Sequence, residues 1–383
     1  MTAPFAGLLI VDLTHVLAGP FASTIMGDLG ARVIKVERPG TGDDTRAFPP
    51  FVKGQSAYFA GLNHGKESIA LDLHADADRK VFEALLDRAD VVVENFRPGV
   101  MERLGYGWDS LHARWPRLIY GAVSGYGHTG PDSQKPAYDM VMQARGGVMS
   151  ITGEEGREPV RSGASVGDII AGMYLAQGLM AALYAREKDG EGRMIDVAML
   201  DGQLAILEHA VAIAAATGKA PGPTGARHPS ITPFETFHAS DGLFVIAAGN
   251  DALFAKLAAL LGHPEWSTDP RLATNAARCD NARFLKRLIE IETLHDTAAN
   301  WIARLEDAGI PTGPIHDVVQ VLQDPQLVAR NMIVHLTDPQ TGATFHAAGN
   351  PIKMTGLEDV TERGPAPALD GDRKAILEWL GMA

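Results

Sequence analysis

An aspartate in a glycine-rich turn, Asp168, is the residue of this chain whose type and setting point most directly to chemistry. It ends the stretch Gly163-Ala164-Ser165-Val166-Gly167-Asp168, and the apolar run at 173–184 predicts a largely buried helix after it. Asp168 should then stand at the N-terminus of that helix, where backbone N–H groups and the helix dipole stabilise an anion. We expect a carboxylate that is ionised at neutral pH, with an ordinary helix N-cap as the alternative reading.

The same turn contains a second candidate nucleophile, Ser165, in the pattern Gly-x-Ser-x-Gly. This pattern is typical of the nucleophile elbow of serine hydrolases, which needs a buried strand before it and a helix after it. Residues 157–161 are charged and include Pro159, where that strand should run. A serine hydrolase that uses Ser165 stays an alternative.

Three arginines follow predicted strands at positions where a ligand could meet them. Arg38 comes directly after the strand predicted at 32–37, Arg97 follows the strand predicted at 90–95, and Arg103 lies a little further on. Open α/β sheets bind ligands at the carboxyl ends of their strands, and the arginine fork matches phosphate oxygens. The three side chains therefore predict a clamp for a phosphorylated ligand.

Familiar nucleotide fingerprints are incomplete in this chain. The first turn after a strand, residues 14–20, lacks the Gly-x-Gly-x-x-Gly pattern that a dinucleotide requires. Residues 61–67 approach a phosphate-binding loop, but the glycine spacing is one residue short and Glu67 replaces the Ser or Thr that binds magnesium. These patterns argue against NAD, FAD and a nucleoside triphosphate.

Strand and helix patterns alternate along the first 200 residues, which predicts an α/β fold with a doubly wound parallel sheet. The predicted strands are 8–13, 32–37, 68–71, 90–95, 118–123 and 194–198, and the predicted helices between them include 21–29 and 75–88. Residues 218–234, rich in Gly, Pro and Thr, read as a linker. We expect a large domain at 1–217 plus 331–383, and a linker with a smaller α/β domain at 218–330.

The smaller domain should contain a strand at 244–248 and helices near 252–262, 280–293 and 297–308. An amphipathic helix at 372–380 indicates that the tail returns to the large domain.

The composition narrows the classes of partner. The 383 residues include 34 Lys and Arg against 47 Asp and Glu, a net charge of −13, which argues against nucleic acid as a general partner. The single cysteine, Cys279, excludes an internal disulfide and a Cys-x-x-Cys metal site, and we expect no metal. The apolar runs at 173–184 and 204–216 are shorter than the roughly 20 residues that a membrane span needs. We expect no membrane association and a cytoplasmic location.

Several ordered motifs resemble those of the class III CoA-transferases, the family of formyl-CoA and carnitine CoA-transferases. They are Thr14-His15-Val16-Leu17-Ala18-Gly19-Pro20, Asp28-Leu29-Gly30-Ala31 with residues 33–40, Val93-Glu94-Asn95-Phe96-Arg97-Pro98-Gly99, Val166-Gly167-Asp168, Gly309-Ile310-Pro311-Thr312-Gly313-Pro314 and Asn350-Pro351-Ile352-Lys353. The resemblance runs nearly end to end. It implies two subunits interlocked like links of a chain, a homodimer in which each subunit has a large and a small domain.

The resemblance also implies a reaction and a site. Asp168 corresponds to the family's catalytic aspartate, which passes through an aspartyl anhydride and an aspartyl-CoA thioester while CoA moves from an acyl-CoA to a small carboxylic acid. Coenzyme A is then a substrate and carrier. The positions that correspond to CoA-binding residues are Leu17, Ala18, Arg38, Leu71, Asp72, Leu73, His74, Asn95, Phe96, Arg97, Arg103, Tyr138 and Asp139, in a segment that begins at Pro136.

Some positions depart from the family. Formyl-CoA transferases have Gln in place of Leu17 and a glycine-rich flap that is not found here, which argues against oxalate and formate as substrates. Relatives carry Lys where this chain has Pro136, although Lys135 is adjacent. The related α-methylacyl-CoA racemases place His before the aspartate that corresponds to Asp139, where this chain has Tyr138, a weak base at neutral pH. The racemase remains an alternative, as does a CoA-binding regulator without catalysis.

The acceptor acid is not specified by these motifs. A dicarboxylate such as succinate would need a cation for its second carboxylate, and Arg145, Arg227 and His228 are candidates for that role.

Overall fold

The computed structural model describes residues 3–382, and the chain forms two compact units. The large unit comprises Met1–Met149, Arg161–Lys219 and Asp324–Ala383, and the small unit comprises Ser150–Val160 and Ala220–Gln323. The sequence-based division placed the boundaries after residues 217 and 330 and assigned 150–160 to the large domain. Those eleven or so residues instead lie in the small unit, where the amide of Gly225 donates a hydrogen bond to the carbonyl of Gly153.

A six-stranded parallel sheet forms the centre of the large unit, in the order β5-β2-β1-β6-β7-β8. Its strands are β1 (Leu9–Asp12), β2 (Arg32–Glu37), β5 (Glu67–Ala70), β6 (Val91–Glu94), β7 (Ile119–Ser124) and β8 (Met194–Ala198). All six were predicted as strands. The chain moves outward from β1 to β5 and then returns to β6 on the other side of β1. The strand order therefore reverses between β1 and β6, where open α/β sheets bind ligands.

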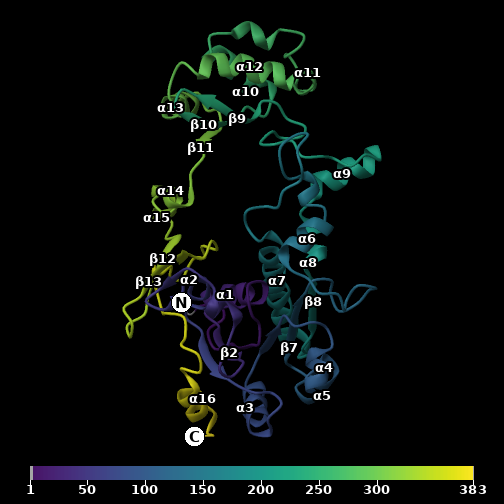
Figure 1. Ribbon diagram of the computed structural model, residues 1–383, viewed down its shortest axis with the longest axis vertical. Helices are drawn as coiled ribbons and strands as arrows, with labels where there is room; N and C mark the ends of the chain where they lie inside the picture. Colours follow the sequence, from purple (N-terminus) through teal and green to yellow (C-terminus); the bar gives the residue numbers. More distant parts are fainter. Residues whose placement is uncertain (1–2, 383) are drawn as a thin grey trace. The chain divides into compact units, whose positions relative to one another are not determined.

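Helices cover both faces of this sheet, as the doubly wound prediction requires (Figure 1). One face packs against α3 (Asp76–Leu86), through Phe82 and Leu85, and the other packs against α1 (Ala18–Asp28) and α7 (Val166–Asp189). The shorter helices of the large unit are α2 (Ala57–Asn63), α4 (Val100–Leu104), α5 (Trp108–Arg114), α6 (Asp139–Arg145), α8 (Met199–Ala205) and α9 (Glu208–Thr217).

The apolar composition of helix α7 would also be typical of a membrane-spanning helix. Within residues 3–382 it is the one single helix that is long and apolar enough to cross a membrane, and α8 with α9 meets the same test as a bent pair. However, Leu175 and Leu179 of α7 are fully buried and pack with Ile10 and Val93 of the sheet. The apolar sequence of α7 is thus accounted for by its place in the core.

The small unit is built on an antiparallel sheet in the order β11-β10-β9. Its elements are β9 (Phe234–Ala239), β10 (Gly242–Ala247), β11 (Thr312–Pro314), α10 (Asp251–Leu260), α11 (Asn275–Asp280), α12 (Ala282–Thr293) and α13 (Ala298–Asp307). The predicted strand and helices are present, whereas β9 was missed because it directly follows the proline-rich linker. Phe237, Phe244, Leu285 and Trp301 form the centre of its core.

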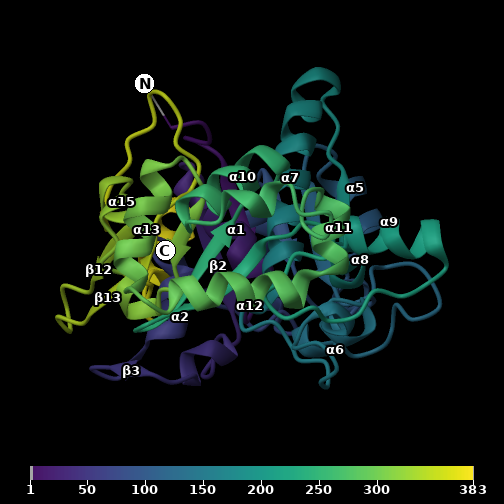
Figure 2. The ribbon, with the colours of Figure 1, turned by 90° about the horizontal axis from the view of Figure 1, so that it is seen from above.

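The C-terminal segment returns to the large unit, as the sequence indicated. After α14 (Val318–Val321) and α15 (Pro325–Ala329), β12 (Ile333–Thr337) pairs with β13 (Thr344–Ala348), side by side in both ribbon views (Figures 1 and 2), and with β14 (Glu362–Arg363). The last helix, α16 (Arg373–Leu380), buries Ile376 and Leu380 in the core cluster that also contains Phe82.

Candidate active site

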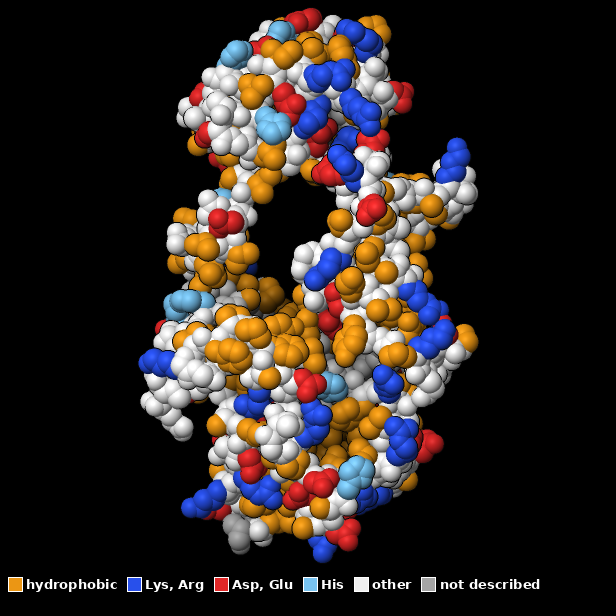
Figure 3. Space-filling view, viewed as in Figure 1, with side chains coloured by type: hydrophobic (Ala, Val, Ile, Leu, Met, Phe, Trp, Pro, Cys, Tyr) orange, Lys and Arg blue, Asp and Glu red, His pale blue; other side chains and the backbone are white. Residues whose placement is uncertain are grey.

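Two adjoining cavities lie at the carboxyl ends of β1, β2, β5 and β6. The first, of about 590 Å³, is named here the Arg103 cavity, and the second, of about 340 Å³, the Asp168 cavity. His15, Phe96 and Val100 line both, so the two cavities adjoin at these side chains. In the space-filling view, apolar side chains lie in a hollow of the large unit with Lys and Arg side chains around it (Figure 3).

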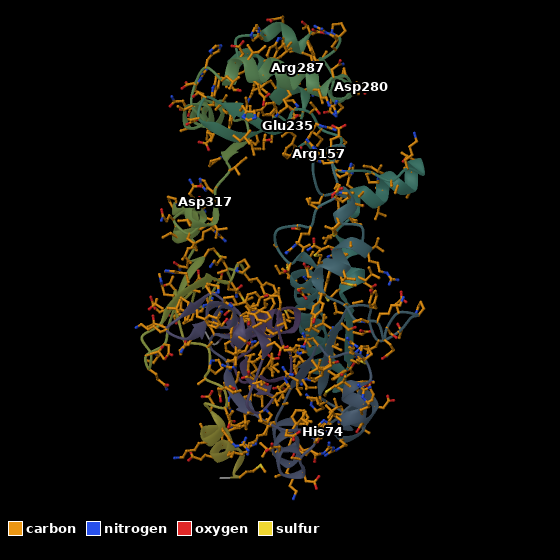
Figure 4. All side chains as sticks on the ribbon, viewed as in Figure 1. His74, Arg157, Glu235, Asp280, Arg287 and Asp317 are labelled. Carbon is orange, nitrogen blue, oxygen red and sulfur yellow. The ribbon has the colours of Figure 1, made fainter. Side chains whose placement is uncertain are left out.

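The cavities bring together all but one of the residues that the sequence assigned to the site. The Arg103 cavity is lined by Arg38, Leu71, Asp72, Leu73, His74, Phe96 and Arg103. The Asp168 cavity is lined by Leu17, Ala18, Asn95, Phe96, Arg97, Tyr138 and Asp168, and also by Lys135 and Pro136. Asp139 lines neither. His74, labelled in Figure 4, lies in the loop that precedes α3.

The three arginines do not form the single clamp that their spacing suggested. Arg38 and Arg103 share the Arg103 cavity, whereas Arg97 lines the Asp168 cavity. Arg38 is also engaged already, because its Nη2 lies 2.5 Å from Oδ1 of Asp44 in an exposed ion pair. Arg103 has no such ion pair within residues 3–382, which leaves it the freer of the two for an anionic ligand.

The turn that carries Leu17 is held in an unusual conformation. Val16 has a φ of 66°, in the left-handed region that β-branched residues rarely adopt. Asn95 clamps the turn from both sides of His15: its Oδ1 accepts the amide of His15 at 2.9 Å, and its Nδ2 donates to the carbonyl of His15 at 2.7 Å. Asn95 therefore places the start of α1 beside Asp168, a role that its assignment as a CoA contact did not anticipate.

Four buried charged side chains lie next to this turn and form two ion pairs. Lys66 lies 3.1 Å from Asp12, and Lys35 lies 3.0 Å from Asp43 and donates to the carbonyl of Thr14 at 2.6 Å. Burial raises the pKa of Asp12, but Lys66 and Lys35 together with hydrogen bonds from Ser23 and Thr14 outweigh burial and hold that pKa well below its usual range. Burial also lowers the pKa of Lys66 to about 8. The sequence signal for this cluster was a lysine between the apolar residues Ile34 and Val36 of the strand predicted at 32–37.

Asp168 is the third residue of α7, and Ser165, not Asp168, occupies the N-cap position. Burial, and after it the charge of Asp139, raises the pKa of Asp168 to about 7. The expectation that Asp168 is fully ionised at neutral pH is therefore wrong. One physical reason is local: the amide of Gly167 donates its hydrogen bond to Asp139 at 2.8 Å, so that this part of the helix N-terminus does not stabilise Asp168.

Ser165 lacks the setting of a nucleophile elbow. Residues 158–162 form no strand, and no side chain hydrogen-bonds to Ser165 from the described part of the chain. The structural basis of the serine hydrolase alternative is therefore missing.

One further side chain near Asp168 escaped the sequence reasoning. Burial raises the pKa of Tyr58, and the charge of Asp168 adds to that effect, which places the Tyr58 hydroxyl in the electrostatic neighbourhood of the site. Tyr58 lies on α2 and packs against Phe48. It belongs to no motif, so no local signal in the sequence could have identified it.

A third cavity of about 530 Å³ lies between α1 and the C-terminal segment of the large unit. Its charges are largely paired, because Arg363 contacts Asp28 and Lys353 lies 2.8 Å from Asp359. Among residues 3–382 there is no group of three or more His, Cys, Asp or Glu side chains that could hold a metal ion.

Comparison with known proteins shows the family to which the chain belongs. The family model described as CoA-transferase family III matches residues 5–373. The chain belongs to CoA-transferase family III. It is 47% identical to the acetyl-CoA:oxalate CoA-transferase of Acetobacter aceti, over 97% of this chain and 95% of that protein. It is 36% identical to the human succinyl-CoA:glutarate CoA-transferase, over 98% of this chain and 85% of that protein.

A solved structure extends the likeness to the fold. The crystal structure of a CaiB/BaiF family protein from Brucella suis matches with a TM-score of 0.87 at 39% identity, covering 99% of this chain and 100% of that chain. The resemblance drawn from the motifs is thus confirmed. The protein is a class III CoA-transferase, which transfers CoA from an acyl-CoA to a carboxylate.

Proposed function

We propose that the acceptor is a short dicarboxylic acid and that Asp168 is the nucleophile that carries CoA between donor and acceptor. The observation that supports this most directly is the composition of the Asp168 cavity. Asp168 is the one carboxylate among the described residues that line it, and the adjoining Arg103 cavity supplies arginines for a phosphorylated carrier. A half-buried carboxylate beside a crevice lined by arginines is what covalent transfer of CoA through aspartate needs.

The reaction balances with Asp168 as the sole covalent group. An oxygen of Asp168 attacks the thioester carbonyl, the C–S bond breaks, and CoA leaves as a thiolate from a mixed anhydride. The thiolate then attacks the carbonyl carbon of Asp168, and the donor acid departs with the bridging oxygen, which leaves an aspartyl-CoA thioester. The acceptor carboxylate repeats the two steps in reverse and restores Asp168. Both covalent intermediates retain the energy of the thioester, provided that water is excluded.

The identity of the acceptor rests on charge in the Asp168 cavity and on the names of relatives. Arg97 lines this cavity and can pair with the second carboxylate of a dicarboxylate, whereas Nζ of Lys135, which lines it too, already lies 2.6 Å from Asp132. Arg145, proposed for this role from the sequence, is already paired with Asp132. Oxalate and glutarate, named for the two relatives, are both dicarboxylates. Leu17 therefore does not exclude oxalate as the acceptor, and oxalate belongs in the panel of acceptors to be tested.

We infer in addition that the enzyme is an interlocked cytoplasmic homodimer. Apolar side chains stand exposed near α14, with 53% of Ile315, 75% of Val318 and 65% of Val319 accessible, which supports burial against a second copy of the chain. Tagged and untagged protein, mixed under native conditions, should give no mixed dimers; rapid exchange or a folded monomer would contradict interlocking.

The experiment that tests the nucleophile compares Asp168→Asn with Ser165→Ala. We expect the first variant to lose several orders of magnitude of transferase activity and the second to keep most of it. Hydroxylamine should trap the acylated wild type as a hydroxamate on Asp168. A dead Ser165→Ala variant with label on Ser165 would refute the mechanism.

A panel of oxalate, glutarate, succinate and acetate against acetyl-CoA and succinyl-CoA then identifies the acceptor. The readout is the mass of the acyl-CoA product. Product formed with acetate as readily as with every dicarboxylate would contradict the proposed acceptor class. Binding of CoA without CoA exchange and without transfer to any acid would favour the regulator, and inversion at an α-carbon would favour the racemase.

A further inference from the structure

Asp139 is a buried carboxylate that the transfer steps above do not use. It is the first residue of α6, it is 9% exposed, and it lines neither cavity. Its Oδ1 accepts the amide of Gly167 and its Oδ2 accepts Nε2 of Gln143, both at 2.8 Å. One carboxylate therefore joins α6 to the first turn of α7, directly beside the residue that carries the nucleophile.

Gln143 extends this connection to the turn before α7. The side chain is fully buried, its Oε1 accepts the amide of Ser162 at 2.8 Å, and its Nε2 also lies 3.4 Å from the carbonyl of Ala164. Asp139 and Gln143 thus fasten residues 162–167 at three points. This stretch has no strand or helix of its own before Val166, so its position depends on these bonds. The two bonds to Asp139 are buried and therefore strong, because water does not compete for them.

The close approach of the two elements requires a glycine. A Cβ atom at position 167 would lie 2.9 Å from Oδ1 of Asp139, closer than such atoms come in proteins. Gly167 therefore lets the carboxylate of Asp139 reach the backbone immediately before Asp168.

The charge of Asp139 also acts on Asp168. After burial, it is the interaction that raises the pKa of Asp168 to about 7. The other titratable groups around Asp168 come from α2 (Tyr58), from the turn after β1 (His15), from the segment after β6 (Arg97) and from the segment before α6 (Lys135 and Tyr138). Two carboxylates in one poorly solvated region repel each other. That repulsion disappears when Asp168 becomes an anhydride or a thioester, since both are neutral.

We propose that Asp139 is a positioning residue for the transfer reaction: through Gly167 and Gln143 it fixes the turn that presents Asp168, and its negative charge favours the acylated forms of Asp168 over the free carboxylate. The proposal rests on Asp168 as nucleophile. No atom of Asp139 forms or breaks a bond. The negative charge that Asp168 gives up on acylation leaves with the departing donor carboxylate, away from Asp139.

The first test removes the charge and keeps the shape. In Asp139→Asn the amide oxygen can still accept the bond from Gly167. The equilibrium between free enzyme with succinyl-CoA and aspartyl-CoA enzyme with succinate is measured by intact mass after an acid quench. We expect the ratio of acylated to free enzyme to fall about tenfold. We also expect the pH midpoint of kcat/KM to fall by about one unit, because a tenfold change in an equilibrium corresponds to one pKa unit. Asp109→Asn, an exposed carboxylate on α5, is the matched control and should change neither quantity.

The second test removes the connection and keeps the charge. Gln143→Met preserves the length of the side chain but loses its bonds to Asp139 and Ser162. We expect kcat to fall about tenfold while the pH midpoint stays within a few tenths of a unit, since the charge of Asp139 remains. This variant also decides the positioning role if Asp139→Asn fails to fold, which circular dichroism would show.

The outcomes separate this proposal from the one on which it rests. Hydroxylamine label on Asp168 of the wild type, together with an unchanged equilibrium and pH midpoint in Asp139→Asn, would overturn the electrostatic role alone. An unchanged kcat in Gln143→Met would overturn the positioning role. Absence of label on Asp168 in the wild type would overturn the nucleophile and, with it, this inference.

Discussion

Gly172 of α7 faces the carbonyl oxygen of Ala18 so closely that a Cβ atom at position 172 would lie 2.6 Å from that oxygen. The same atom would lie 3.2 Å from Cβ of Phe21. Gly172 stands one helical turn after Asp168, and Ala18 is the first residue of α1. This crossing sets how near the start of α1 comes to the nucleophile.

We therefore predict that Gly172→Ala impairs both stability and catalysis. The added methyl group meets backbone, which cannot swing aside, so α1 must shift and carry Leu17 and Ala18 with it. Overpacking of this kind costs about 1–3 kcal/mol in the free energy of unfolding, measured by urea titration. We also expect a lower kcat. Gly61→Ala, where a Cβ meets nothing within 4 Å, is the control, and equal behaviour of the two variants would contradict the argument.

Arg103→Ala should weaken CoA binding more than Arg38→Ala does. Both side chains line the Arg103 cavity, but Arg38 already has Asp44 as a partner, whereas a phosphate would be the first strong partner of Arg103. A charged hydrogen bond contributes about 1.5–3 kcal/mol, which corresponds to a loss of roughly ten- to a hundredfold in affinity by calorimetry. Lys374→Ala, on exposed α16, should leave affinity unchanged. Unchanged affinity in both arginine variants would remove the cavity from the CoA site.

The stability of Asp168→Asn relative to wild type should depend on pH. The pKa of Asp168 is about 7 in the folded protein and about 4 in an unfolded chain. The folded state therefore holds the proton more tightly, and the stability linked to that proton is complete below about pH 4 and is lost as the pH rises through about 7. Asparagine has no such loss, so the difference in Tm between variant and wild type should widen between about pH 5 and pH 8. A difference that does not vary with pH would show that Asp168 titrates normally.

Lys66→Met should destabilise the large unit strongly. The variant leaves Asp12 buried beneath the turn at Thr14 without its nearest cation, and breaking a buried pair on one side costs about 3–5 kcal/mol. The free energy of unfolding from urea titration measures this. Lys80→Met, on the exposed face of α3, should stay within about 0.5 kcal/mol of wild type. A similarly small effect of Lys66→Met would indicate that Lys35, Ser23 and Thr14 suffice to stabilise Asp12.

The sequence predicted the sheet well because its signals are local. The β-branched residues of the strand 32–37 and the apolar run after Asp168 are visible in the composition, and the motif around Asn95 and Arg97 marks a strand end. What was missed depends on contacts between distant segments. The bond from Gly167 to Asp139 joins residues 28 positions apart, and it changes the ionisation of Asp168 that a helix N-terminus alone would have predicted. The placement of Tyr58 beside Asp168 likewise has no trace in its neighbours along the chain.

The place of helix α16 in the core determines when the large unit can finish folding during synthesis. The ribosome makes all six sheet strands well before α16, yet Ile376 and Leu380 belong to the same core as Phe82 and Leu85 of α3. Until α16 is made, the core on the α3 face of the sheet lacks these two side chains. The small unit, by contrast, has its whole core between residues 237 and 310 and can close while synthesis continues. We therefore expect the large unit to complete its core later in synthesis than the small unit does.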